Sequence, residues 1–212
     1  MNLWPRYPEV MAFTRDSLAG HFLIADIDLT DPPFLRSVVL LLDHGPEGAF
    51  GLVVNRPLGL TAAQIAQEPG ETVDFPERRG KIPLYGGGPV ETQAVFTLHS
   101  GLPIIWRSPG YREIRPGLFF EPSFPALKPY VSGEAPELPL DDTPVIRLYL
   151  GYAGWGEGQL EAELDRGSWQ VIEARSSLVF QTPPQDIWKR AMEIRGGFWG
   201  IVAQTGIKPS LN

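Results

Sequence analysis

The chain has 212 residues, of which 43% are hydrophobic and 20% charged, and it contains no cysteine. This length and near-average composition predict one globular domain, and the lack of cysteine excludes disulfides, thiolate metal sites and a cysteine nucleophile. The formal net charge of -7 argues against direct binding to nucleic acid, because that affinity depends on neutralising phosphates with Lys and Arg.

The sequence also carries no signal for export or membrane insertion. No stretch approaches the roughly 20 apolar residues that a membrane-spanning helix needs. The first eight residues lack the basic and apolar regions of a secretory signal. We therefore predict a cytoplasmic protein with no membrane association. We expect residues 1–212 to form a single domain, with residues 1–15 as an N-terminal extension and residues 132–143 as an acidic surface loop.

Apolar, β-branched runs bounded by Gly and Pro predict most of the strands. The predicted strands are 20–27, 34–42, 49–54, 82–85, 94–99, 118–120, 145–150, 168–173 and 177–180. The turn-forming residues Asp43 to Gly48 separate the second run from the third, which predicts a hairpin. Pro57 ends the third run, because proline has no N–H to donate to a ladder.

Three helices are predicted between and after these strands. Thr61 and Gln64 fit a capping box at the start of a short helix. Helices 158–165 and 184–195 follow from apolar spacing, the second with Pro at its start and Gly beyond its end. Strands outnumber helices and do not alternate with them. This pattern predicts an α+β fold with a mixed, largely antiparallel, curled or partly barrel-like sheet and a few peripheral helices.

This arrangement predicts which residues are buried and which segments meet at the ends of the strands. We expect a buried core and a last helix that docks on the sheet through Trp188. The expected core residues are Val38, Leu40, Leu52, Val54, Leu148, Leu150, Leu160, Leu164 and Trp188. Two glycine-rich segments, 86–89 and 151–161, each follow a predicted strand. If those two strands are parallel neighbours, the segments meet and form one wall of a cleft.

The first glycine-rich segment, residues 151–161, joins a predicted strand to a predicted helix. Glycines there allow positive φ and let a ligand approach the backbone. The dinucleotide template G-x-G-x-x-G, started at Gly154, is met at Gly156 but fails at Gln159, which disfavours nucleotide binding. Two interpretations stay open: a tight connection with Tyr152 and Trp155 in the core, or a binding site of another kind.

The second glycine-rich segment follows the predicted strand 82–85 and contains Gly86, Gly87, Gly88 and Pro89. It is not a P-loop, because no Lys-Ser or Lys-Thr follows and Pro89 lacks an N–H. A close backbone crossing explains three successive glycines as well as a ligand does. Both interpretations stay open here too.

The sequence gives little support for a metal-binding site or a serine nucleophile. The chain has three histidines, His21, His44 and His99, and their spacing matches no metal motif. No G-x-S-x-G elbow occurs, and neither Ser37 nor Ser100 has a convincing relay. We therefore predict no metal and no cofactor.

An ordered set of motifs resembles the YqgE/AlgH family. The motifs are GHFLIA at 20–25, RSVVLL at 36–41, DH at 43–44, GAFGLVVNRP at 48–57, GGPV at 87–90, LH at 98–99, GYAGWG at 151–156 and GQLE at 158–161. The resemblance implies a compact bacterial α+β domain and says little of function. Some members carry a transcriptional-regulator label, but no helix-turn-helix pattern occurs here.

Two hypotheses of function come from different classes. The first is a non-catalytic binding or regulatory module for a small ligand or a protein partner, with any effect on transcription indirect. Its candidate binding residues are Asn55, Arg56, Gly86, Gly87, Gly88, Pro89, Tyr152, Trp155, Gln159 and Glu161. The alternative is a hydrolase or isomerase in which His44 or His99 is the general base and Asp43 or Glu161 orients it.

Overall fold

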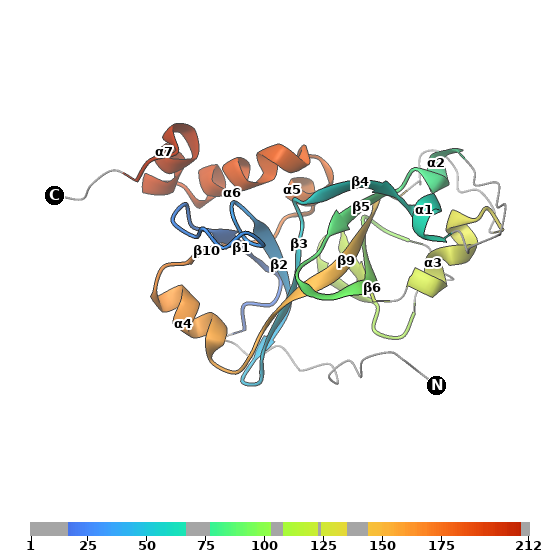
Figure 1. Cartoon of the computed structure of the whole chain (residues 1–212), viewed down its shortest axis with the longest axis horizontal. Helices are drawn as coiled ribbons and strands as arrows, with labels where there is room; N and C mark the ends of the chain where they lie inside the picture. Colours follow the sequence, from blue (N-terminus) through green and yellow to red (C-terminus); the bar gives the residue numbers. More distant parts are fainter. Residues whose placement is uncertain (1–16, 67–76, 103–107, 123, 135–143, 209–212) are drawn as a thin grey trace.

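A curled β-sheet organises the chain (Figure 1). The computed structural model describes residues 17–66, 77–102, 108–122, 124–134 and 144–208. The expected N-terminal extension and the part of the acidic loop after residue 134 lie outside the described residues. The strands are β1 (His21–Ala25), β2 (Val38–Gly45), β3 (Gly48–Val53), β4 (Pro57–Thr61), β5 (Pro83–Gly86), β6 (Val90–His99), β7 (Arg112–Arg115), β8 (Leu118–Glu121), β9 (Ile146–Trp155) and β10 (Trp169–Glu173).

The helices are short and lie around the sheet. They are α1 (Ala62–Ala66), α2 (Glu77–Gly80), α3 (Phe124–Val131), α4 (Gln159–Asp165), α5 (Ser176–Phe180), α6 (Ile187–Arg195) and α7 (Phe198–Thr205), with a 3-10 turn, η3 (Pro184–Asp186), before α6. In Figure 1, α6 and α7 lie beside β1 and β10, whereas α1, α2 and α3 gather at the opposite end. None of the described helices is long and apolar enough to span a membrane.

Among the described residues, the strands follow the order β10-β1-β2-β3-β9-β6-β8-β7. All of these neighbours are antiparallel, while β5 runs parallel to β9 and pairs with β4. Arg115 of β7 reaches back to the start of this order, donating to the Gly20 carbonyl at 2.9 Å and pairing with Glu173 of β10 at 3.0 Å. The predicted mixed, largely antiparallel and curled sheet is confirmed.

The β2–β3 hairpin shows how the sheet separates two apolar layers. Leu40 pairs with Leu52, and both join the cluster inside the curl. Val39 and Val53 also pair, but they face the layer under α4. Because neighbouring residues of a strand point to opposite faces, the long apolar run in β2 serves both layers.

Helix α6 docks on the sheet as predicted. Pro184 opens the preceding turn, and Gly196, with φ near +76°, follows the last helical residue. Trp188 is 6% exposed, and its indole N–H donates to the carbonyl of Ala25 in β1 at 2.8 Å. Most of the expected core is buried, although Leu150 and Leu164 are only half-buried.

Some elements differ from the sequence-based expectation. The strand predicted at 177–180 is wrong, because these residues belong to helix α5. Three successive apolar residues, 178–180, do not distinguish strand from helix, and here Leu178 and Val179 are both buried. Five short elements were not predicted, namely β4, β7, α2, α3 and α7. Strand β9 also extends to Trp155, so residues 151–155 lie in the strand rather than in a connection.

Candidate ligand pocket

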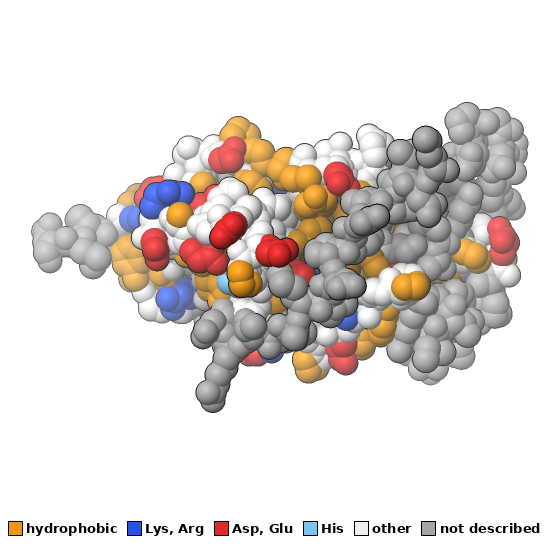
Figure 2. All heavy atoms as spheres, turned by 90° about the horizontal axis from the view of Figure 1, so that it is seen from below, with side chains coloured by type: hydrophobic (Ala, Val, Ile, Leu, Met, Phe, Trp, Pro, Cys, Tyr) orange, Lys and Arg blue, Asp and Glu red, His pale blue; other side chains and the backbone are white. Residues whose placement is uncertain are grey.

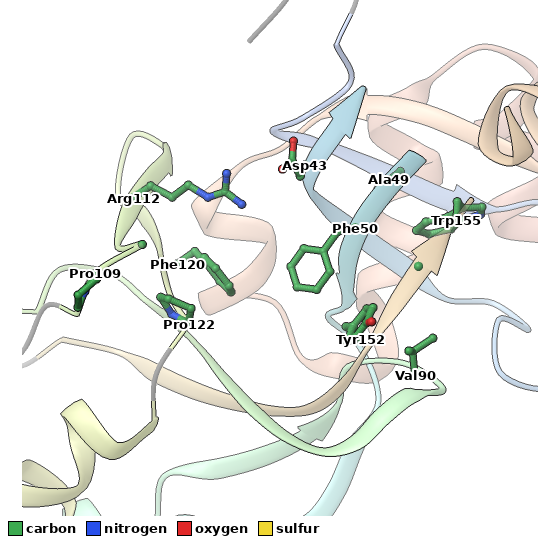
Figure 3. A pocket seen from close by; sticks show the side chains of 12 residues that line it. Asp43, Ala49, Phe50, Val90, Pro109, Arg112, Phe120, Pro122, Tyr152 and Trp155 are labelled. Atoms are coloured by element: carbon green, nitrogen blue, oxygen red, sulfur yellow. The ribbon is translucent and has the colours of Figure 1, made fainter. Parts of the chain in front are cut away.

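A pocket of about 680 Å³ opens inside the curl of the sheet (Figure 3). Its lining comes from β2, β3, β6, β7, β8 and β9 and from the segments that flank β7 and β8. The lining residues are Asp43, Ala49, Phe50, Val90, Pro109, Gly110, Arg112, Phe120, Pro122, Tyr152, Gly154 and Trp155. The volume lies within the range of sites that bind drug-sized molecules.

Strand β3 leads from the core into this pocket. Along its inner face, Leu52 is fully buried, whereas Phe50, two residues earlier, is only half-buried. The Phe50 ring lies 4.9 Å from the ring of Tyr152 and 5.6 Å from the ring of Phe96. The pocket floor is therefore the open end of the aromatic core.

The neighbouring strand β9 continues the same wall, since Phe50 of β3 pairs with Gly154 of β9. Tyr152 and Gly154 share the inner face, since they are two residues apart. A Cβ at Gly154 would come within 3.2 Å of the Tyr152 ring, so glycine leaves that ring uncovered. Burial, followed by the charge of Glu91, raises the pKa of the Tyr152 phenol. The hydroxyl is therefore a neutral group at pH 7.

Arg112 and Asp43 bring opposite charges to the pocket. Figure 3 shows the Arg112 side chain extending toward Asp43. Its guanidinium lies 5.6 Å from the centre of the Phe120 ring. Burial lowers the pKa of Arg112, and the negative charge of Asp43 opposes that effect. Asp43 is held by its Oδ1 atom, which accepts the backbone N–H of His44 at 2.9 Å.

The two glycine-rich segments meet where β5 runs parallel to β9. The N–H of Gly87 donates to the Leu150 carbonyl at 2.7 Å, and the Gly87 carbonyl accepts the N–H of Val53 at 2.8 Å. A Cβ at Gly87 would overlap the carbonyl oxygen of Gly151, and one at Gly88 would overlap the backbone of Tyr152. We call this contact between 86–88 and 151–152 the glycine crossing. Backbone fills the space beside Gly87 and Gly88.

Asn55, Arg56 and Pro89 lie outside the pocket lining. Asn55 accepts the N–H of Val38 and donates to the Arg36 carbonyl, both at 2.9 Å. Arg56 donates to the carbonyl of Leu35, and its own carbonyl accepts the N–H of Gly86. These polar groups tie the segment before β2 to the chain after β3.

Gln159 and Trp155 belong to a network around Glu163. Trp155 is 6% exposed, and its indole N–H, like that of Trp169, donates to Glu163 Oε2, at 2.9 and 2.8 Å. Gln159 donates to Glu163 Oε1 at 3.0 Å and accepts the N–H of Gly156. Burial alone would raise the pKa of Glu163, but the donors Trp169, Gln159 and Trp155 together lower it.

His44 and Glu161 form the histidine–carboxylate pair considered for catalysis. His44 Nε2 lies 2.8 Å from Glu161 Oε1, and His44 Nδ1 accepts the N–H of Leu18 at 3.0 Å. A ring whose Nδ1 accepts carries its proton on Nε2, which then donates to Glu161. The pKa of Glu161 is lowered by its backbone hydrogen bond and then by His44. Neither side chain lines the pocket.

His99 lies elsewhere, fully buried between aromatic rings. Its Nδ1 accepts the N–H of Leu102 at 2.9 Å, and its ring stacks on Phe119 and Tyr111. The residues that the structure describes contain no group of three or more His, Asp or Glu side chains able to hold a metal ion.

Of the residues singled out in the sequence, the pocket brings together Tyr152, Trp155 and Asp43. The sequence analysis did not single out Phe50, Phe120 or Arg112. A signal for the β7–β8 hairpin was present, since Pro116-Gly117 is a turn sequence before the apolar residues of β8. The strand Arg112–Arg115 has one buried residue, Ile114, so its apolar pattern is weak.

Comparisons with known proteins agree on one family. A sequence model described as AlgH-like matches residues 22–199. UPF0301 proteins of Myxococcus xanthus and Chlorobaculum tepidum are 37% and 34% identical over 180 and 199 residues. These matches cover 85% and 91% of the chain and 92% and 95% of the relatives. The resemblance drawn from the sequence motifs is confirmed.

Solved structures support the same conclusion. The solution structure of the AlgH protein from Pseudomonas aeruginosa is 32% identical, with a TM-score of 0.67, and the match covers 94% of this chain and 99% of that chain. A crystal structure of a Corynebacterium diphtheriae protein has a TM-score of 0.65 at 23% identity, covering 91% and 94%. The second likeness shows the fold alone. Neither description states a reaction or a ligand.

Proposed function

The chain belongs to the AlgH-like family, and we propose that it is a non-catalytic binding module for a small, largely apolar ligand held in the aromatic pocket. The observation that carries the proposal is the pocket's lining, in which Phe50 and Tyr152 are half-buried although they extend the buried core. Apolar surface left open beside a core is stabilised when a ligand covers it.

In this proposal the protein acts in the bacterial cytoplasm and any effect on transcription is indirect. The net charge of -7 opposes contact with a phosphate backbone. A ligand that fills the pocket would bridge β3, β7, β8 and β9 and stiffen the curl. A protein partner could then distinguish the liganded from the free form.

The alternative is a hydrolase or isomerase based on His44 and Glu161. Their 2.8 Å contact favours it. Two observations weigh against it: both ring nitrogens of His44 are engaged, and neither residue lines the pocket. A general base needs a free lone pair within reach of the substrate.

The test is a thermal-shift screen of a ring-rich small-molecule library against wild type and Val90→Trp. Val90 lines the pocket, and an indole there would occupy its volume. Gln93→Trp adds the same indole at an exposed position of β6 outside the lining and serves as the control. We expect stabilising compounds for wild type and Gln93→Trp that lose their effect on Val90→Trp. Hits that act equally on all three proteins, or a screen without hits, would refute the pocket's role.

A further inference from the structure

Arg112 is a cation whose contacts are incomplete. Within the part of the chain that the structure describes, its guanidinium makes a cation–π contact with Phe120 and an electrostatic interaction with Asp43, and it has no hydrogen bond or ion pair. A guanidinium has five N–H donors, and partial burial removes water from some of them. The free protein therefore holds a partly desolvated cation on the wall of an apolar pocket.

The geometry points to the ligand group that would complete these contacts. A carboxylate can accept two parallel hydrogen bonds from a guanidinium, which is a strong and directional interaction. Burial lowers the pKa of Arg112, as expected for a cation that lacks an anion in contact. An anion bound beside it would reverse that effect.

Asp43 limits how much negative charge the pocket accepts. Among the described residues that line the pocket, Arg112 is the only cation and Asp43 the only anion. On the face shown in Figure 2, acidic side chains lie among apolar and uncharged polar ones. In the pocket, a phosphate dianion would face Asp43 with one cation to bind it, whereas a carboxylate adds a single charge.

The remaining walls select the body of the ligand. Phe50, Phe120 and Tyr152 present ring surfaces, with Val90 and two prolines between them. Ring faces favour stacked or edge-on contact with another ring. Resting on the proposed function, we infer that the pocket binds a small ring-bearing monocarboxylic acid, with the carboxylate on Arg112 and the ring against Phe50, Phe120 and Tyr152.

Three probes that share one ring system test this inference by isothermal titration calorimetry. The probes are 1-naphthaleneacetate, its uncharged amide, and 1-naphthyl phosphate. We expect the acetate to bind about tenfold more tightly than the amide, as a charge-assisted hydrogen bond predicts. We also expect the phosphate to bind more weakly than the acetate at pH 8, where it is mostly a dianion.

Substitutions of the two charges should act in opposite directions. Arg112→Gln should remove the preference for acetate over amide, and Arg112→Lys should restore part of it. Asp43→Asn should strengthen acetate binding, by about threefold at low salt, because it removes a negative charge beside the ligand. The amide's affinity should change little in all three variants. General damage to the pocket would weaken both probes together, so circular dichroism and the amide's affinity serve as controls.

The outcomes separate the inference from the proposed function. Equal binding of acetate and amide, or a preference for acetate that survives Arg112→Gln, would overturn the inference while the pocket stays a binding site. Tighter binding of the phosphate would overturn the limit to a single charge. Failure of all three probes to bind would contradict the inference, and the library screen on Val90→Trp then decides the proposed function by itself.

Discussion

The glycine crossing and the aromatic pocket share strand β9, but they use it in different ways. At the crossing, backbone atoms fill the space beside Gly87, Gly88 and Gly151. One residue farther along, Tyr152 faces a volume of about 680 Å³ that no side chain fills. Glycines that look suited to ligand approach here allow two strands to pack closely. The space for a ligand is framed by aromatic side chains from strands far apart in the sequence.

The largest expected effect is on the crossing. Gly87→Ala should destabilise the protein by about 3 kcal/mol or more, because the new Cβ overlaps a backbone oxygen that cannot move without separating β5 from β9. Gly86→Ala is the matched control, since its Cβ would make an ordinary 3.6 Å contact with Leu58. Urea unfolding of both variants measures the difference. Equal stabilities of the two variants would show that the glycine crossing has room for a side chain at Gly87.

The pocket should respond differently to loss of a ring. Phe96, 1% exposed, lies in the core, and Phe96→Ala should cost about 3–5 kcal/mol. Phe50→Ala should cost roughly half as much, since the half-buried Phe50 ring already faces open volume. Phe50→Ala should nevertheless abolish binding of any compound that stabilises the wild type. A Phe50 variant as unstable as the Phe96 variant would mean that the pocket is closed in solution.

A smaller effect is expected at Glu163, where β9 meets α4. Glu163→Gln should cost about 1 kcal/mol at pH 7, because two indole N–H groups lose a charged acceptor. The pKa of Glu163 is lowered in the folded state, so its stabilisation is present above the ordinary glutamate pKa of about 4.3 and is lost as the pH falls below it. The gap between wild type and variant in urea melts should therefore narrow toward pH 3. A gap that is constant with pH would contradict this role.

Local patterns predicted the parts of the fold that depend on local order. The β2–β3 hairpin follows from two apolar runs around a turn, and α6 follows from its apolar spacing and flanking Pro and Gly. Strand β7 was not predicted, because its polar residues gain their partners only through β8 and through the contacts of Arg115 with Gly20 and Glu173. Helix α5 was predicted as a strand, because four residues are too few to show a period.

Less of the candidate site than of the fold could be predicted from the sequence, because the site depends on contacts between residues far apart in the chain. Tyr152 and Trp155 drew attention through the glycines around them. Phe50 and Phe120 gave no signal, since a strand phenylalanine normally faces a filled core. The order of elements predicted a curled sheet, but no local pattern shows that the curl brings these two rings together with Arg112.

The most direct test of the account is a two-dimensional ¹H–¹⁵N NMR titration of the protein with a compound that stabilises it in the thermal-shift screen. The account predicts chemical-shift changes at the backbone amides of residues 49–50, 110–112, 120 and 152–155, which surround the pocket. The amides of α4 and of residues 86–88 should change less. Chemical-shift changes centred on residues 86–88 or 156–161, with the pocket amides unchanged, would contradict the account. They would indicate that the glycine-rich segments form the binding site.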